Sequence, residues 1–150
     1  IDMALAMSTN MFEKYNIQIL KNYQSIPSIV TDKIKLMQIL ANIIQNAQDA
    51  LVEEASSKEK KIFINIDYDK LAKKIIIKIK DSGIGILPDN IAKIFSLRFT
   101  TKEKGHGFGL HMCAIDAQSM GGSLTAESKG IGEGATFILT LPEIATKNHF

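Results

Sequence analysis

The sequence predicts an α/β two-layer sandwich, in which one mixed sheet of about five strands is covered on one face by three main helices. Short stretches of alternating apolar residues are bounded by turn residues, as expected of strands with one buried face. Longer stretches carry apolar residues every three or four positions, as expected of amphipathic helices. With 150 residues, the chain has the length of a single domain.

The first third of the chain is expected to form a helix, an edge strand and a second, longer helix. Helical spacing predicts a helix over residues 2–15, and alternation predicts an edge strand over residues 17–23. Thr31 or Asp32 is suited to cap a long helix that runs to about Ala55.

The remaining elements follow from the same patterns. They are strands over 62–68 and 74–80, a short helix from Pro88 to Phe95, a helix over 108–120 ended by Gly121 and Gly122, and strands over 123–128 and 135–141. Alternation in the second of these strands ends directly on Asp81, which places a carboxylate at a strand end before a glycine turn. Residues 143–150 are expected to be a frayed tail.

Composition excludes several classes of protein. Eighteen basic and 16 acidic residues give a net charge of +2 without a basic cluster, so nucleic acid is not indicated as a partner. The lone Cys113 excludes an internal disulfide and suits a reducing compartment. No apolar run reaches the roughly 18 residues of a membrane span, so no direct membrane contact is expected of this domain. Because the chain opens at Ile1, we expect a fragment of a longer protein, whose membrane anchoring stays open.

Three polar residues share one face of the predicted long helix. Asn42, Asn46 and Asp49 stand at positions i, i+4 and i+7. Asparagine and aspartate are mediocre helix formers, so this row calls for an explanation. One interpretation is a solvated face; the other is a row of oxygen ligands for a hard cation such as magnesium.

Two glycine-rich segments follow, Asp81–Gly85 and Gly105–Leu110. Each lets the backbone approach a ligand closely, because glycine has no Cβ. Leu110 stands where the dinucleotide-binding pattern GxGxxG requires glycine, and the chain has no GxxxxGK[ST] segment. Both common nucleotide-binding templates are therefore excluded.

Together these segments resemble the catalytic and ATP-binding domain of histidine kinases, in the superfamily shared by gyrase, Hsp90 and MutL. The motifs occur in the family's order: an N box at 42–50, a G1 box at 81–85, an F box at 95–102, a G2 box at 105–110 and a G3 element at 134–137. The resemblance extends from about residue 4 to Pro142. It implies the Bergerat-type ATP-binding fold, with ATP and Mg²⁺ as cofactors.

The resemblance gives Asp81 the role of adenine reader. Its carboxylate would accept a hydrogen bond from the exocyclic amine, whereas guanine would present a carbonyl there. Thr136 would support Asp81, and Gly83 and Gly85 would let the backbone lie against the base. Without the resemblance, Asp-Ser-Gly is simply a common turn.

The resemblance also assigns roles to the polar row. Asn46 would be the magnesium ligand, and Asn42 stands where hydrolytic relatives place a glutamate that activates water. Because an amide is no general base at neutral pH, phosphotransfer is favoured over hydrolysis. Asp49 occupies a position where many histidine kinases carry a basic residue, and we expect it to support its neighbours.

The F box departs from the commoner pattern, since Ser96-Leu97-Arg98 stands in place of Glu-Pro-Phe. Lys102 would still contact the β- or γ-phosphate, so the catalytic set is Asn42, Asn46 and Lys102. Arg98 is either a surface residue or a contact to phosphate or a partner domain. Residues 99–105 are expected to form a mobile lid. The implied nucleotide contacts are Asn42, Asn46, Asp49, Asp81, Gly83, Gly85, Thr101, Lys102, Gly105, His106, Gly107, Phe108, Gly109, Leu110 and Thr136.

None of the three histidines, His106, His111 and His149, lies in a phosphoacceptor context. The expected function is therefore to bind Mg-ATP and donate its γ-phosphoryl group to a histidine on an upstream dimerisation and phosphotransfer domain. A response regulator would be an indirect partner, and the domain would be cytoplasmic. The alternatives are a regulatory ATP-binding module, such as an anti-sigma kinase or a non-transferring domain, and a gyrase- or MutL-like ATPase.

Overall fold

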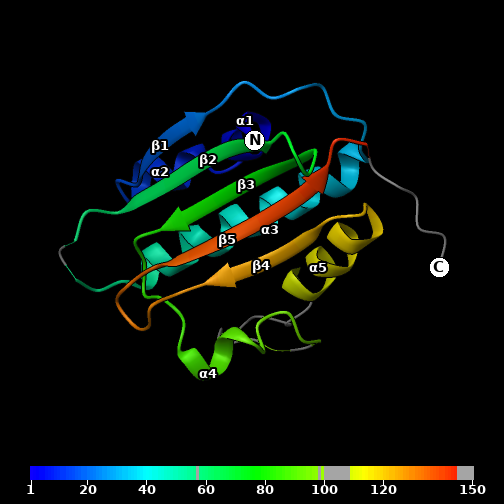
Figure 1. Ribbon diagram of the computed structural model, residues 1–150. Helices are drawn as coiled ribbons and strands as arrows, with labels where there is room; N and C mark the ends of the chain where they lie inside the picture. Colours follow the sequence, from blue (N-terminus) through cyan, green and yellow to red (C-terminus); the bar gives the residue numbers. More distant parts are fainter. Residues whose placement is uncertain (57, 98, 100–108, 145–150) are drawn as a thin grey trace.

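Five strands form one mixed sheet, in the order β1-β2-β3-β5-β4 (Figure 1). The computed structural model describes residues 1–56, 58–97, 99 and 109–144. The strands are β1 (Gln18–Tyr23), β2 (Lys61–Asp69), β3 (Lys74–Asp81), β4 (Ser123–Glu127) and β5 (Ala135–Pro142). β1 runs parallel to β2, and every other neighbouring pair is antiparallel. The predicted α/β sandwich, with β1 as an edge strand, is confirmed.

The long helix α3 (Lys33–Glu53) passes behind the strands in Figure 1 and packs against both β3 and α5 (Gly109–Ser119). Asp32 is its N-cap, since one carboxylate oxygen accepts hydrogen bonds from the backbone nitrogens of Ile34 and Lys35, both at 3.1 Å. The expected cap and helix are confirmed, with the C-terminal end at Glu53 rather than Ala55.

The single helix expected over residues 2–15 is divided into α1 (Asp2–Ala6) and α2 (Thr9–Lys14). The break falls at Met7 and Ser8, directly before Thr9, whose side chain competes with helical hydrogen bonding. The Thr9 hydroxyl donates to the Ala6 carbonyl at 3.1 Å and so satisfies an acceptor at the end of α1. Helical spacing of the apolar residues was correct, but it did not reveal this break.

The two faces of the sheet differ in burial, as the alternating sequence pattern predicted. Ile75, Ile77 and Ile79 of β3 are buried on the helix side, and Asp81 continues this face at the strand end. The intervening residues of β3 lie on the open side, where Lys78 and Lys80 line a shallow hollow. The helix side of the sheet therefore carries the core, and it also carries the Asp81 side chain.

Two segments differ in extent from their expected bounds. The helix predicted from Pro88 to Phe95 begins at Pro88 but is a single turn, α4 (Pro88–Ile91), which a series of turns follows. The tail is held in place through residue 144: Val30 donates to the Glu143 carbonyl at 3.1 Å, and Val30 forms a bridge with Ile144. The prediction of a frayed end for 145–150 lies outside the described residues.

Candidate functional site

Asp81 brings a buried carboxylate to the end of β3, as the sequence predicted. It is 1% exposed, and Gly83 donates a backbone hydrogen bond to its Oδ1 at 2.9 Å. Burial raises the pKa of Asp81 to about 6, and hydrogen bonds from the backbone of Gly83 and Ala135 partly offset this rise. A carboxylate held this way is short of solvation and is suited to accept a hydrogen bond from a ligand amine.

The glycines next to Asp81 are required by contacts within the protein. A Cβ on Gly83 would lie 2.6 Å from the backbone carbonyl of Ala50 in α3. A Cβ on Gly85, whose φ is +76°, would lie 2.0 Å from the Gly130 oxygen. That these glycines also face a base stays a prediction, because packing within the protein is enough to require glycine at both positions.

A second loop, residues 128–134, lies across the loop that follows Asp81. Gly134 donates to the Gly83 carbonyl at 3.2 Å, and Gly132 donates to the Ile84 carbonyl at 2.7 Å. A Cβ on Gly134 would lie 2.1 Å from the Asp81 backbone oxygen. The G1 box and the G3 element are thus in direct contact.

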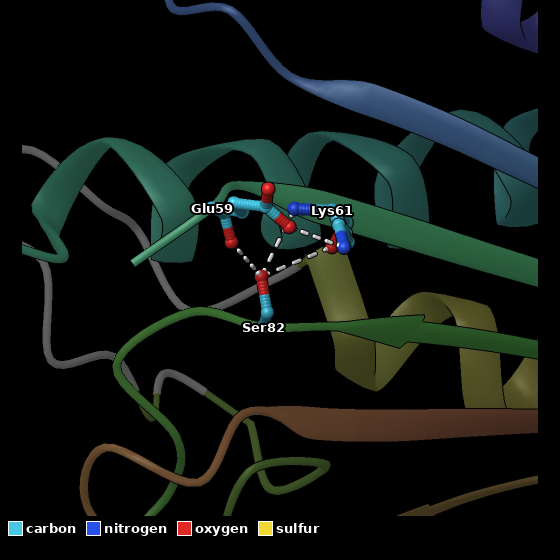
Figure 2. Close-up of polar contacts among 3 residues, drawn as sticks. All are labelled: Glu59, Lys61 and Ser82. Atoms are coloured by element: carbon cyan, nitrogen blue, oxygen red, sulfur yellow. Dashed lines mark hydrogen bonds and ion pairs between the residues drawn. The ribbon is translucent and has the colours of Figure 1, made fainter. Parts of the chain in front are cut away.

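Two serine hydroxyls fix these loops, and the sequence reasoning missed both. Figure 2 shows Ser82 joined to both Glu59 and Lys61: its Oγ accepts from the Lys61 backbone nitrogen at 2.9 Å and donates to the Glu59 carbonyl at 3.0 Å. Lys61 and Glu59 also form an ion pair. Ser128 holds the other side, donating to the Gly134 carbonyl at 2.6 Å and accepting from Ile86 at 3.0 Å. The repeated glycines around Ser128 were the available signal for a second tight loop.

The polar row of α3 begins at Asn42, which lies beside the start of α5. The Asn42 Nδ2 donates to the Gln38 carbonyl at 3.1 Å, and its Oδ1 would lie only 2.8 Å from a Cβ on Gly109. Asn46 and Asp49 are half-buried on the same helix, and Asp49 accepts a hydrogen bond from Gln45 at 2.8 Å. All three residues carry oxygens of the kind that magnesium prefers, so the donor chemistry fits the ion.

Phe95 of the F box is attached to α5 and to the core. The His111 Nδ1 lies 3.0 Å from the Phe95 carbonyl. The Phe95 ring meets the Phe137 ring edge to face, with centroids 6.3 Å apart. His111 therefore joins the F box to the start of α5, where Gly109 and Leu110 are the described part of the G2 box.

Thr136 does not lie beside the Asp81 carboxylate, which corrects the expected support. The partner of Asp81 across the strands is Ala135, whereas Thr136 pairs with Lys80. Because side chains alternate along a strand, Thr136 faces the open side of the sheet and lines the hollow there with Lys80 and Glu127. The sequence motif was located correctly, but the side chain was assigned to the wrong face.

Several predicted residues lie outside the described part of the chain. These are Arg98, Thr101, Lys102, Gly105, His106, Gly107, Phe108 and His149. Within the described ranges, no group of three or more His, Cys, Asp or Glu residues is arranged to hold a metal. No helix in those ranges is long and apolar enough to cross a membrane.

Comparisons with known proteins agree with this arrangement. Residues 31–145 match the family described as histidine kinase-, DNA gyrase B- and HSP90-like ATPase. The sensor histidine kinase TmoS of Ectopseudomonas mendocina is 30% identical over 79% of this chain and 12% of its own length. The sensor protein FixL of Bradyrhizobium diazoefficiens is 32% identical over 76% of this chain and 22% of its own. The chain thus spans a small part of these relatives.

Solved structures show the same fold. The catalytic domain of histidine kinase ThkA matches with a TM-score of 0.80 and 27% identity, over 95% of this chain and 91% of that one. Full-length ShkA, in complex with AMPPNP, matches with a TM-score of 0.82 and 23% identity, over 97% of this chain and 30% of that one. The chain belongs to the family of histidine kinase-, DNA gyrase B- and HSP90-like ATPases and, within it, to the ATP-binding catalytic domains of histidine kinases.

Proposed function

We propose that this domain binds ATP with magnesium and donates the γ-phosphoryl group to a histidine on a separate dimerisation domain of its parent protein. A response regulator would then receive the group from that histidine. A cytoplasmic location belongs to the same proposal. The observation that carries it is the buried Asp81 carboxylate at the end of β3, where the following loop meets α3 at Ala50.

Asp81 supports adenine as the base. Its carboxylate is largely removed from water, and the Gly83 and Ala135 backbone groups satisfy only part of its capacity to accept hydrogen bonds. The exocyclic amine of adenine would donate to it. Guanine presents a carbonyl at that position, which would leave two buried acceptors facing each other.

The polar row supports a magnesium-bound phosphate group beyond the base. Asn42 and Asn46 offer amide oxygens and Asp49 offers a carboxylate, one helical turn apart along α3. We assign Asn46 to the ion itself. Magnesium would offset the phosphate charge, while the chain holds the nucleotide in position, which is most of what phosphoryl transfer requires.

Asn42 supports transfer over hydrolysis. Its Nδ2 is engaged with the Gln38 carbonyl, so the Oδ1 is the group presented toward Gly109 at the start of α5. An amide oxygen cannot take a proton from water at neutral pH, so no general base stands at this position. This disfavours a gyrase- or MutL-like ATPase, whereas a regulatory ATP-binding module remains the alternative for phosphotransfer itself.

Calorimetric titration of Mg-ATP and Mg-GTP tests the choice of base. We expect ATP to bind more tightly than GTP, and Asp81→Asn to weaken ATP binding by about 1–3 kcal/mol, since an amide replaces the pure acceptor. Equal affinity for both nucleotides, or an unchanged ATP affinity in the variant, would contradict the role of Asp81.

The same titration with Asn46→Ala tests the metal. The variant should lose more ATP affinity in magnesium buffer than in EDTA, because only the magnesium-bound complex uses the Asn46 oxygen. Gln38→Ala, an exposed change on α3, is the control. Equal losses in both buffers would assign Asn46 a structural role in α3.

A further inference from the structure

Ser128 follows β4 and uses the full hydrogen-bonding capacity of its hydroxyl. A serine hydroxyl has one proton to donate and two lone pairs to accept with. The Ser128 Oγ donates to the Gly134 carbonyl at 2.6 Å, and it accepts from the backbone nitrogens of Ile86 at 3.0 Å and Gly130 at 3.3 Å. One half-buried side chain thus satisfies three backbone groups in two loops.

These bonds form a short path to Asp81. Ser128 holds the Gly134 carbonyl, and the Gly134 nitrogen donates to the Gly83 carbonyl at 3.2 Å. The Gly83 nitrogen in turn donates to the Asp81 Oδ1 at 2.9 Å. On the other side, Ser128 holds Ile86, which is in the same loop as Gly83. The hydroxyl therefore fixes both the loop after Asp81 and the loop that crosses it.

We infer that Ser128 is a positioning residue for nucleotide selectivity: its hydroxyl holds the loop over residues 82–87 so that the Asp81 carboxylate is aligned with the base. This rests on the proposed ATP-binding function. Ser128 acts through Gly83 and Asp81, and it has no contact with the nucleotide in this role. Loss of its hydroxyl should therefore reduce the discrimination between ATP and GTP, because GTP gains nothing from an aligned Asp81.

Ser82 is the other hydroxyl beside Asp81, and its bonds have a different consequence. It links the end of β3 to the start of β2 through Lys61 and Glu59 (Figure 2). That contact extends the pairing between two strands that are already joined along their length. Ser128, in contrast, bonds both to the loop after Asp81 and to the loop that crosses it, so loss of its hydroxyl acts on both loops at once.

The test measures Mg-ATP and Mg-GTP affinities by calorimetry for wild type, Ser128→Ala and Ser119→Ala. Ser119 is the matched control, since its Oγ also donates to a backbone carbonyl, that of Asp116 at 2.8 Å, and it accepts from Lys35 at the far end of α5. Ser128→Thr and Ser128→Val form a second pair of equal size that differs only in the hydroxyl. The free energy of unfolding is measured for every variant.

We expect Ser128→Ala to weaken ATP binding by about tenfold and to leave GTP binding nearly unchanged. Ser119→Ala should lower stability without changing the ATP/GTP ratio, and Ser128→Thr should keep the ratio that Ser128→Val loses. If Ser128→Ala does not fold, the comparison of Ser128→Thr with Ser128→Val decides whether the hydroxyl sets the ATP/GTP ratio. In the Asp81→Asn background the effect of Ser128→Ala on the ratio should disappear, because the group it aligns is gone.

Three results would overturn the inference: equal weakening of ATP and GTP, the same ratio in Ser128→Thr and Ser128→Val, or a persistent effect in the Asp81→Asn background. Failure of the wild type to bind ATP selectively would instead contradict the proposed function. The two failures are therefore distinguishable in one set of titrations.

Discussion

Asp81 is the residue at which stability and function oppose each other. Its side chain is buried on the core side of the sheet, where an apolar residue would continue the pattern of Ile75, Ile77 and Ile79. Burial disfavours the charged form and raises its pKa to about 6. The domain without nucleotide therefore bears the cost of a partly desolvated carboxylate, and a bound amine donor would reduce that cost.

The raised pKa predicts how stability changes with pH. Because the folded-state pKa lies above the usual value of 3.8, folding favours the protonated form, so this stabilising contribution is present at low pH and is lost as pH rises through about 6. Relative to Asp81→Asn, the wild type should lose up to about 3 kcal/mol of unfolding free energy between about pH 4 and about pH 7. Urea denaturation of both proteins across this range measures it. A difference that is constant with pH, or of opposite sign, would contradict the raised pKa.

Gln48 is the other buried polar side chain of the described residues. It is 3% exposed in the middle of α3, and its Oε1 has no hydrogen-bond partner within the described structure. An unsatisfied buried acceptor destabilises the fold. A methionine side chain is nearly as long as that of glutamine but has no amide oxygen to leave unsatisfied.

We therefore expect Gln48→Met to raise the free energy of unfolding by about 1 kcal/mol. Gln38→Met, at an exposed position of the same helix, should change it by less than about 0.5 kcal/mol. Chemical denaturation compares the two. A loss of stability in Gln48→Met would show that the amide makes a favourable interaction after all.

At the scale of elements, sequence patterns predicted what depends on local periodicity. Alternation located β3 and its end at Asp81, and a capping residue before an apolar run located the start of α3 at Asp32. The break between α1 and α2 was missed, because it depends on how the Thr9 hydroxyl competes for a carbonyl. The alternation that identified β5 also fixes which residues share a face of the sheet. Because Asp81 pairs with Ala135, Thr136 lies on the opposite face from Asp81.

Sequence patterns did not predict the contacts between loops. Gly85 and Gly132 look equivalent in sequence, and both have positive φ, +76° and +80°. Only the fold shows that Gly85 lies against the Gly130 carbonyl, whereas nothing lies within 4 Å of a Cβ on Gly132. The roles of Ser82 and Ser128 depend on the same crossing of two loops that are far apart in the sequence.

The two glycines give a matched test of that crossing. Gly132→Ala should cost about 1 kcal/mol of unfolding free energy, the strain of a left-handed conformation alone. Gly85→Ala adds a clash with backbone and should cost about 3 kcal/mol. Thermal and urea denaturation of the two variants compare these losses. Equal losses would mean that the loops over residues 82–87 and 128–134 are not packed together as described.

At the scale of the whole molecule, the fold brings the described parts of the five motifs together. Asn42 of the N box meets Gly109 of the G2 box, and Gly83 of the G1 box meets both α3 and Gly134. The F box reaches the same region through Phe95 and His111. The order of the motifs was readable from the sequence, but their contacts depend on the long-range pairing of β3 with β5.

In the proposed function the domain holds the nucleotide, and the acceptor histidine is expected on another domain. His111, the histidine of the described residues, has its Nδ1 at the Phe95 carbonyl. Asn42 carries an amide at the position where a hydrolytic relative is expected to carry the carboxylate that activates water. The domain alone should therefore bind ATP without turning it over.

Incubation with ATP labelled in the γ-phosphate tests this account most directly, with the domain alone and then with the dimerisation and phosphotransfer domain of its parent added. We predict that neither phosphate release nor labelling occurs with the domain alone, and that the added domain becomes labelled on histidine. The Asp81→Asn variant, which should bind ATP poorly, serves as the control. With this variant, the added domain should receive much less label. Phosphate release by the domain alone would indicate an ATPase. Stable labelling of His106 or His111 would place the acceptor within this chain. Absence of labelling with both domains present would contradict the assignment as a histidine kinase catalytic domain that transfers phosphate.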